Sequence, residues 1–221
     1  MTNENTVYLN PDLLHPFENN PFQSVDESEY DELRDSVKEF GIITPLIVNK
    51  SDNGYEIISG HRRWQIAKEL NLDVVPVYVR EFSKEEAVIN FVDCNLSREK
   101  ILPSEKARAY KMKHDAIKKQ GARTDLTSSQ VGTKFRSDEK LAETIPDSRM
   151  QIQRYIRLNN LQQPLLDMVD EERISFTPAV ELSYLTEEEQ CYLITTIESE
   201  DCTPSLSQAQ RMHKLSDEKK L

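Results

Sequence analysis

The stretch YEIISGHRRWQIAKEL, residues 55–70, decides how the first half of this sequence is expected to fold. Its first four residues, Tyr55–Ile58, favour a strand. The serine and glycine that follow break this pattern, and apolar side chains then recur at helical spacing as far as Leu70. We therefore predict a strand, a tight glycine turn and a helix that begins near His61.

Two arginines, Arg62 and Arg63, fall in the first turn of this predicted helix. A helix start already carries unpaired N–H groups and the positive end of the helix dipole, so two cations there are unfavourable unless an anion lies among them. Because a guanidinium pairs with two phosphate oxygens at once, one interpretation is a phosphate-binding cradle. The other is that both arginines pair with carboxylates of this acidic half. Local spacing leaves both interpretations open.

Charge along the chain is uneven. Residues 1–97 carry 8 basic and 18 acidic side chains, residues 98–157 carry 15 and 8, and residues 158–221 carry 5 and 13. The total of −11 therefore hides a middle segment of net +7 between two acidic ends. This pattern is typical of a chain that meets a polyanion with one segment only.

Composition narrows the class of protein. The sequence has 221 residues, of which 30% are charged, and no apolar run approaches the length of a membrane span. The start, MTNENTVYLN, has neither the basic region nor the apolar core of an export signal, so we expect a cytoplasmic protein without membrane contact. Three widely spaced cysteines without a CxxC pair argue for a reducing compartment and against a zinc site.

Further elements are expected on both sides of the opening stretch. A helix that buries Tyr30, Leu33, Val37 and Phe40 should end at Gly41. The other expected features are a strand over 42–49, a hairpin turn at Asn53-Gly54, a strand over 74–79 that completes a strand–helix–strand crossover, and a helix from a Ser83–Glu86 capping box to about residue 95.

The strands should stop near residue 80, which predicts an α+β chain with a small mixed-sheet domain over 1–100 and an all-α domain over 101–221. A basic helix should open at Pro103 and end near Gln120, before a polar loop over 121–137.

The second domain contains a helix-turn-helix pattern over 138–158. A short helix with Leu141, Ala142 and Ile145 precedes a second one that Asp147 or Ser148 can cap and that packs through its isoleucines and Tyr155. Exposed Arg and Gln are side chains that read base edges in the major groove, although many three-helix packings share this apolar spacing. The residues expected to face outward and bind DNA are Ser148, Arg149, Met150, Gln153, Arg154 and Arg157.

Three stretches in this order resemble the ParB-type partition proteins. GIITPLIV (41–48) with YEIISGHRRW (55–64) is similar to the family's ParB/sulfiredoxin-like N-terminal core and its glycine-acid-Arg-Arg motif, NLSREKILPSEKARAY (95–110) to its Asn-x-x-Arg motif, and LAETIPDSRMQIQRYIRL (141–158) to its helix-turn-helix. The resemblance covers roughly residues 7–185.

What the resemblance implies is a dimeric, CTP-gated clamp that loads at a specific site on double-stranded DNA of a chromosome or plasmid, with Mg²⁺ and a Walker-type partner ATPase. It places the protein with the nucleoid or plasmid in the cytoplasm. The nucleotide-binding residues that it implies are Gly60, His61, Arg62, Arg63, Asn95 and Arg98.

Two departures from the family pattern bear on activity. His61 stands at the position of the acid, and Cys94 at the position of a glutamate linked to metal binding and hydrolysis. Because a thiol is a poor ligand for Mg²⁺, nucleotide binding is expected while a weak CTPase activity and the metal and catalytic residues are left open.

Rival functions remain. The main one is a sequence-specific transcription regulator with a non-hydrolysing ParB-like domain, and another is a protein-interaction module without nucleotide. Sulfiredoxin activity is disfavoured because Gly60 stands where that enzyme has its cysteine, and no cluster of metal ligands supports a nuclease.

Overall fold

The computed structural model describes residues 6–22, 27–98, 100–125 and 147–218, with only the backbone described for 121–125. They divide into two compact units, of which unit 1 is Met1–Arg98 with Ala116–Ser129 and unit 2 is Glu99–Asp115 with Gln130–Leu221. The assignment of two domains with a boundary at residue 100 stays a prediction.

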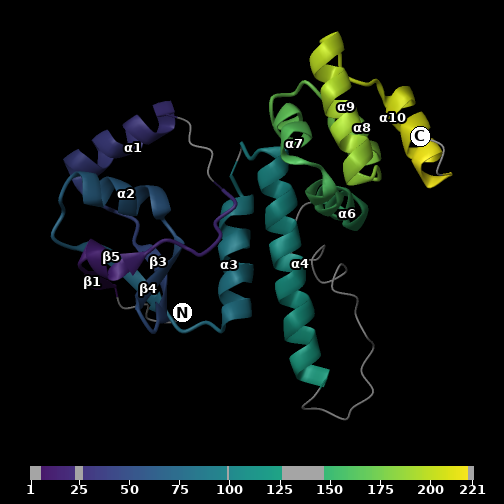
Figure 1. Ribbon diagram of the computed structural model, residues 1–221. Coiled ribbons are helices and arrows are strands. Elements are labelled where there is room, and N and C mark those ends of the chain that lie inside the picture. The colour runs from purple at the N-terminus through teal and green to yellow at the C-terminus, as the bar shows by residue number, and fades with distance from the viewer. Residues whose placement is uncertain (1–5, 23–26, 99, 126–146, 219–221) are drawn as a thin grey trace. The chain divides into compact units, whose positions relative to one another are not determined.

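Unit 1 combines a small sheet with helices (Figure 1). Its strands are β1 (Val7–Leu9), β2 (Leu14–His15), β3 (Leu46–Ser51), β4 (Gly54–Ser59) and β5 (Val75–Arg80). Its helices are the 3-10 turn η1 (Pro11–Leu13), α1 (Glu27–Phe40), α2 (His61–Glu69) and α3 (Lys84–Leu96).

The five strands form one mixed sheet in the order β1-β5-β3-β4-β2. β3 and β4 are an antiparallel hairpin, as predicted, with Ser51 opposite Gly54 across a turn made by Asp52 and Asn53. The expected crossover from β4 through α2 to β5 is wrong, because β4 runs antiparallel to β3 while β5 runs parallel to it, so β4 and β5 point in opposite directions. The hairpin places β4 on the far side of β3, so α2 carries the chain back across the sheet.

The core of unit 1 lies between the sheet and α2. Leu46, Val48, Ile57 and Val77 are buried there together with Ala67 of α2. At their margin Trp64 packs on the cluster, and its indole Nε1 donates a 2.9 Å hydrogen bond to the carbonyl oxygen of Pro11. The apolar residues of the opening stretch therefore fasten α2 to the sheet and fix where that helix begins.

Two predictions at the start of unit 1 need correction. Of the four side chains expected to form the apolar face of α1, only Val37 is buried, and Phe40 is 64% exposed. The reason is that α1 packs along α2 through a narrow strip of its surface. The strand expected from residue 42 begins only at Leu46. Gly41 does end α1, with a left-handed φ of 71° that L side chains rarely adopt.

Unit 2 is helical. Its described elements are the first half of α4 (Pro103–Asp125), α6 (Arg149–Arg157), the 3-10 turn η2 (Leu158–Asn160), α7 (Gln163–Asp170), α8 (Phe176–Leu182), α9 (Glu187–Glu200) and α10 (Leu206–Asp217). Leu158, Leu165 and Leu182 are fully buried in one core with Ala107 of α4 and Ala209 of α10.

Pro103 opens α4 as predicted, but the helix passes through Gly121 to Asp125, so its expected end at Gln120 is wrong. A glycine inside a helix costs only about 1 kcal/mol, which a long helix tolerates. The first helix of the helix-turn-helix, with Leu141, Ala142 and Ile145, and most of the loop over 121–137 lie outside the described residues.

After Arg80, every regular element among the described residues is a helix, so the predicted α+β class, a mixed sheet followed by helices, is confirmed. None of the described helices is both long and apolar enough to cross a membrane.

Candidate functional site

The start of α2 has the backbone shape that the opening stretch predicts. Gly60 occupies the N-cap position with φ 103° and ψ 24°, in the left-handed region, and makes no side-chain cap. A Cβ at this position would lie 2.8 Å from Cγ of Leu46, whose side chain is fully buried. Glycine is therefore required here by both conformation and space, and the first turn of α2 presents its N–H groups without a competing cap.

The two arginines of this turn have different partners. Arg62 forms a 3.1 Å ion pair with Glu29 of α1, a carboxylate that is 57% exposed. Arg63 instead donates hydrogen bonds to the carbonyl oxygens of Thr44 and Pro45 in the segment before β3. Burial lowers the pKa of Arg63, but a guanidinium remains charged at neutral pH. Because its partners are neutral, the positive charge of Arg63 is not cancelled by them.

A cavity of about 290 Å³ opens beside Arg63. Its wall consists of the end of α1, the segment that leads to β3, and the Arg63 side chain. The lining residues are Leu33, Ser36, Val37, Gly41, Ile42, Ile43, Thr44 and Arg63. The lining thus combines the charged Arg63 and the polar Ser36 and Thr44 with apolar side chains.

His61 does not join the arginines. Its Nε2 accepts a 3.2 Å hydrogen bond from the backbone N–H of Phe17, and its ring meets the edge of Phe91, which stacks on Phe17 with centroids 4.0 Å apart. Burial, with a smaller contribution from the positive Arg98, lowers the pKa of His61 from 6.5 to about 4. A neutral imidazole with its proton on Nδ1 therefore stands where the family's motif has an acid.

The residues of the second expected motif lie at the end of α3. Asn95 is buried, and its amide donates a 2.8 Å hydrogen bond to the carbonyl oxygen of Phe91, one turn earlier. Arg98 lies over the ring of Phe22, 5.6 Å from its centre. In this arrangement Asn95 holds its own helix, while Arg98 shares an aromatic cluster with His61.

Cys94 lines a separate cavity with Ile58, Arg80 and Asn90. Burial and the neighbouring Asp93 carboxylate raise the pKa of the thiol, and a hydrogen bond with Ser59 offsets only part of this rise. A protonated thiol is a poor donor to a hard cation, and no group of three or more His, Cys, Asp or Glu within the described ranges could hold a metal ion. The donors present here do not fit Mg²⁺.

In unit 2, α6 has the predicted cap and the predicted inner face. Ser148 accepts a 3.3 Å hydrogen bond from the N–H of Gln151, and Ile152 is fully buried. Met150 is 76% exposed, and Ser148 and Gln153 are exposed as well. Arg149 is partly exposed. The cap and the first half of α6 thus present four of the six side chains that were expected to face outward: Ser148, Arg149, Met150 and Gln153.

The last two arginines of α6 depart from that prediction. Arg154 donates a 3.0 Å hydrogen bond to Oγ1 of Thr177 and lies over the ring of Phe176. Arg157 lies 3.8 Å from the ring centre of Tyr184. Both guanidiniums pack against α8 or the residues that follow it, because planar cations gain by stacking on aromatic rings, and neither extends into solvent as expected.

One contact that the sequence did not predict fixes the start of α6 on α4. The hydroxyl of Tyr110, which is buried, donates a short hydrogen bond to the carboxylate of Asp147, and Lys106 lies 4.0 Å from the same carboxylate. The ring of Tyr110 also meets the edge of Tyr155. Burial raises the pKa of Tyr110, so it remains a donor at neutral pH. A tyrosine on a basic helix gave no signal of this role.

Two family models match the chain in the order of its two units. The ParB N-terminal domain matches residues 1–96, and the ParB HTH domain matches residues 129–217. The chain belongs to the ParB family. The resemblance on the three quoted stretches is thereby confirmed.

Among curated relatives of this ParB-family chain is "Stage 0 sporulation protein J" of Bacillus subtilis, which is 36% identical over 164 residues. That match covers 73% of this chain and 51% of the relative, and other ParB relatives match over a similar share. The chain thus spans about half the length of the curated relatives it matches.

Solved structures support the fold. A C-terminally truncated chromosome-partitioning protein ParB of Caulobacter crescentus, complexed to the centromeric parS site, has a TM-score of 0.56 at 19% identity and covers 94% of this chain and 98% of its own. A Pnob8-like ParB-N domain has a TM-score of 0.58 at 18% identity and covers 89% and 91%. At this identity the likeness concerns the fold alone.

Proposed function

We propose that this chain is a DNA-binding partition protein whose hold on DNA is controlled by a nucleotide, with CTP as the nucleotide that the family resemblance implies. Curated relatives from Rickettsia are named "Probable chromosome-partitioning protein ParB", and the Caulobacter protein was crystallised on its parS site. The alternative is a sequence-specific regulator that uses the helix-turn-helix and has a silent N-terminal unit.

The observation that carries the proposal is the start of α2. A left-handed glycine without a side-chain cap, two arginines in the first turn and an adjoining cavity of about 290 Å³ combine the groups that a triphosphate requires. The proposed nucleotide-binding residues are Gly60, His61, Arg62, Arg63, Asn95 and Arg98, of which Arg62 and Arg63 would contact phosphates directly. Mg²⁺ would then enter on the phosphates, since the protein offers no suitable donors at Cys94.

The DNA contacts are proposed for α6. Ser148, Arg149, Met150 and Gln153 lie at the cap and in the first half of α6 and are exposed or partly exposed, and the positive charge of residues 98–157 would draw this unit to the phosphate backbone. A dimer, a Walker-type ATPase partner and a cytoplasmic location on nucleoid or plasmid are further parts of the same proposal.

Calorimetry with the four ribonucleoside triphosphates, each with Mg²⁺ and with or without duplex DNA, tests the nucleotide site. Arg62→Ala should weaken binding of CTP about tenfold, because it removes one charge-assisted hydrogen bond to a phosphate. Arg34→Ala is the matched control, since Arg34 also lies in unit 1 and pairs with a carboxylate, Asp31, at 3.0 Å. Absence of heat with every nucleotide, DNA present or absent, would leave only the regulator.

Retention on closed circular DNA separates the two functions. A clamp that encloses DNA stays on a circle when salt is raised after CTP is added, and leaves when the circle is cut. A regulator held only by charge and base contacts leaves both forms equally. Phosphate release in the same mixtures should stay at background, and Cys94→Glu restores the carboxylate of the family pattern as a comparison.

A further inference from the structure

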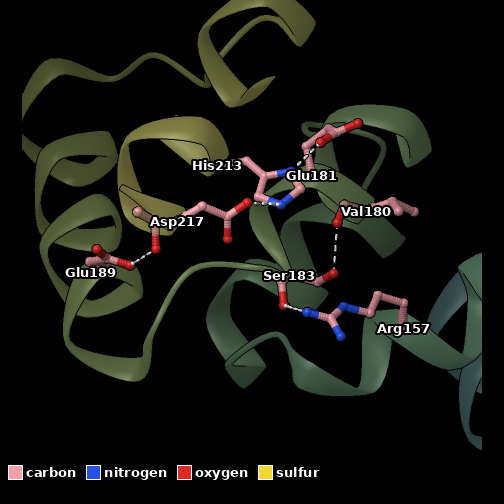
Figure 2. Close-up of polar contacts among 8 residues, drawn as sticks. Arg157, Val180, Glu181, Ser183, Glu189, His213 and Asp217 are labelled. Atoms are coloured by element: carbon pink, nitrogen blue, oxygen red, sulfur yellow. Dashed lines mark hydrogen bonds and ion pairs between the residues drawn. The ribbon is translucent and has the colours of Figure 1, made fainter. Parts of the chain in front are cut away.

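Arg157 ends α6 in an unusual environment (Figure 2). Its guanidinium carbon lies 3.8 Å from the ring centre of Tyr184, and its Nη2 donates a long, 3.4 Å hydrogen bond to the carbonyl oxygen of Ser183. Its Nε is buried and has no hydrogen-bond partner within the described part of the chain. Because this guanidinium makes one long hydrogen bond and leaves its Nε unpaired, stacking on the aromatic ring is its main interaction.

The same tyrosine ring also receives a side chain from α10. The imidazole of His213 stacks on Tyr184 with centroids 4.0 Å apart and planes 16° apart. The imidazole is fixed in turn by carboxylates on both sides, since its Nδ1 lies 2.7 Å from Oε2 of Glu181 and its Nε2 lies 3.5 Å from Oδ2 of Asp217 (Figure 2). Arg157, Tyr184 and His213 therefore form a continuous stack from the last turn of α6 to α10.

We propose that Arg157 is a positioning residue and not a DNA-contacting one: with Tyr184 and His213 it fixes the end of α6 against α10. The inference rests on the proposed DNA binding by α6. Base edges are read only when a helix is held to within a fraction of an ångström, whereas phosphate contacts tolerate displacement. The stack should therefore determine how well α6 discriminates its specific DNA site from other sequences.

This role makes a distinction that can be measured. A phosphate-binding arginine contributes to the salt dependence of binding, and its removal reduces that slope by about 0.9 for each phosphate that is no longer neutralised. It also weakens binding to all sequences alike, and lysine largely replaces it. A positioning arginine contributes to discrimination, leaves the salt slope unchanged, and is not replaced by lysine, which lacks the flat guanidinium.

The experiment uses the full chain and two probes: a duplex enriched from a random-sequence pool by the wild-type protein, and a mixed-sequence duplex of equal length. Arg157→Ala and Arg157→Lys should each weaken binding to the enriched duplex about fivefold, the scale of one stacked cation, and leave binding to the mixed duplex unchanged. Tyr184→Phe keeps the ring and should therefore retain wild-type discrimination between the two duplexes, whereas Tyr184→Ala should lose as much as Arg157→Ala. The variant that combines Arg157→Ala with Tyr184→Ala should lose no more discrimination than either single variant. Arg211→Ala, an exposed charge on α10, is the control.

The outcomes are separable. A salt slope that falls by about 0.9 in Arg157→Ala, with equal losses on both duplexes and rescue by lysine, would assign Arg157 to a phosphate and overturn the inference. Additive losses in the double variant would overturn it as well. If the wild-type protein enriches no duplex from the pool, the proposed function itself fails. Should Arg157→Ala melt at the working temperature, the charge-conserving Arg157→Lys decides the question alone.

Discussion

Gly60→Ala should destabilise unit 1, for a reason that can be divided into two parts. The first is conformational, because the backbone at Gly60 has φ 103°. The second is steric, because the new Cβ would lie 2.8 Å from Cγ of Leu46, a fully buried side chain that cannot rotate away freely. Real Cβ atoms do not approach another heavy atom so closely, so the β3 side or α2 must shift.

The magnitude follows from these two parts. An L side chain in the left-handed region costs roughly 1–2 kcal/mol, and insertion of a methyl into a packed core adds about 1–3 kcal/mol. We therefore expect Gly60→Ala to lower the free energy of unfolding by about 3 kcal/mol. Gly41→Ala is the matched control, because Gly41 also has a positive φ, of 71°, but nothing lies within 4 Å of a Cβ there. It should lose only the conformational part, about 1 kcal/mol.

Urea unfolding followed by tryptophan fluorescence measures the difference. The chain has one tryptophan, Trp64, which lies in α2 four residues after Gly60 and so reports on unit 1. If Gly60→Ala and Gly41→Ala lower the free energy of unfolding equally, within about 0.5 kcal/mol, then Leu46 moves aside without loss of stability and the packing argument is wrong. A larger loss at Gly41 would contradict the conformational argument too.

Three further predictions concern side chains with unusual surroundings. Because the pKa of His61 is about 4 when folded and 6.5 when unfolded, the contribution of His61 to the unfolding free energy should be constant above pH 6.5 and fall by roughly 3 kcal/mol between pH 6.5 and pH 4, and His61→Gln should remove this contribution from the profile of urea midpoints. Tyr110→Phe should cost about 1.5 kcal/mol in thermal unfolding by removing a hydrogen bond to the carboxylate of Asp147, while Tyr192→Phe, which is exposed, should stay within about 0.5 kcal/mol. Because its pKa is raised, Cys94 should react with iodoacetamide at pH 7 more slowly than free cysteine, as mass spectrometry of its peptide would show; an equal rate would contradict the raised pKa.

Local signals in the sequence were sufficient for the elements around the proposed sites. The strand, turn and helix of residues 55–70, the Ser83–Glu86 capping box and the Ser148 cap follow from spacing and residue type alone. Which strands pair with each other could not be predicted in this way, since the parallel pairing of β3 with β5 depends on which edge of the sheet remains open after the hairpin forms. Propensity describes one segment at a time, whereas pairing is decided between segments.

Side-chain direction was less predictable than helix position. Helical spacing places Arg154 and Arg157 on the outer part of α6, but it carries no information about aromatic rings that arrive from α8 and from the segment after it. Phe17 gave no signal for a similar reason: it belongs to a proline-broken segment with no pattern of its own, yet its backbone N–H fixes the tautomer of His61.

Arg62 pairs with a carboxylate, as the second interpretation of the opening stretch expects, whereas Arg63 contacts carbonyl oxygens; the phosphate-binding interpretation stays a prediction. Glu29 is 57% exposed, and ion pairs with exposed partners contribute only about 0–1 kcal/mol, so a phosphate could replace that carboxylate at little cost. The contacts of Arg63 are different, because neutral carbonyl oxygens fix the direction of the guanidinium without cancelling its charge. At the proposed phosphate site, Arg63 would already be oriented, whereas Arg62 would first have to leave the Glu29 carboxylate. It follows that Glu29→Gln should strengthen binding of a triphosphate, whereas removal of a partner that merely stabilised the fold would leave it unchanged.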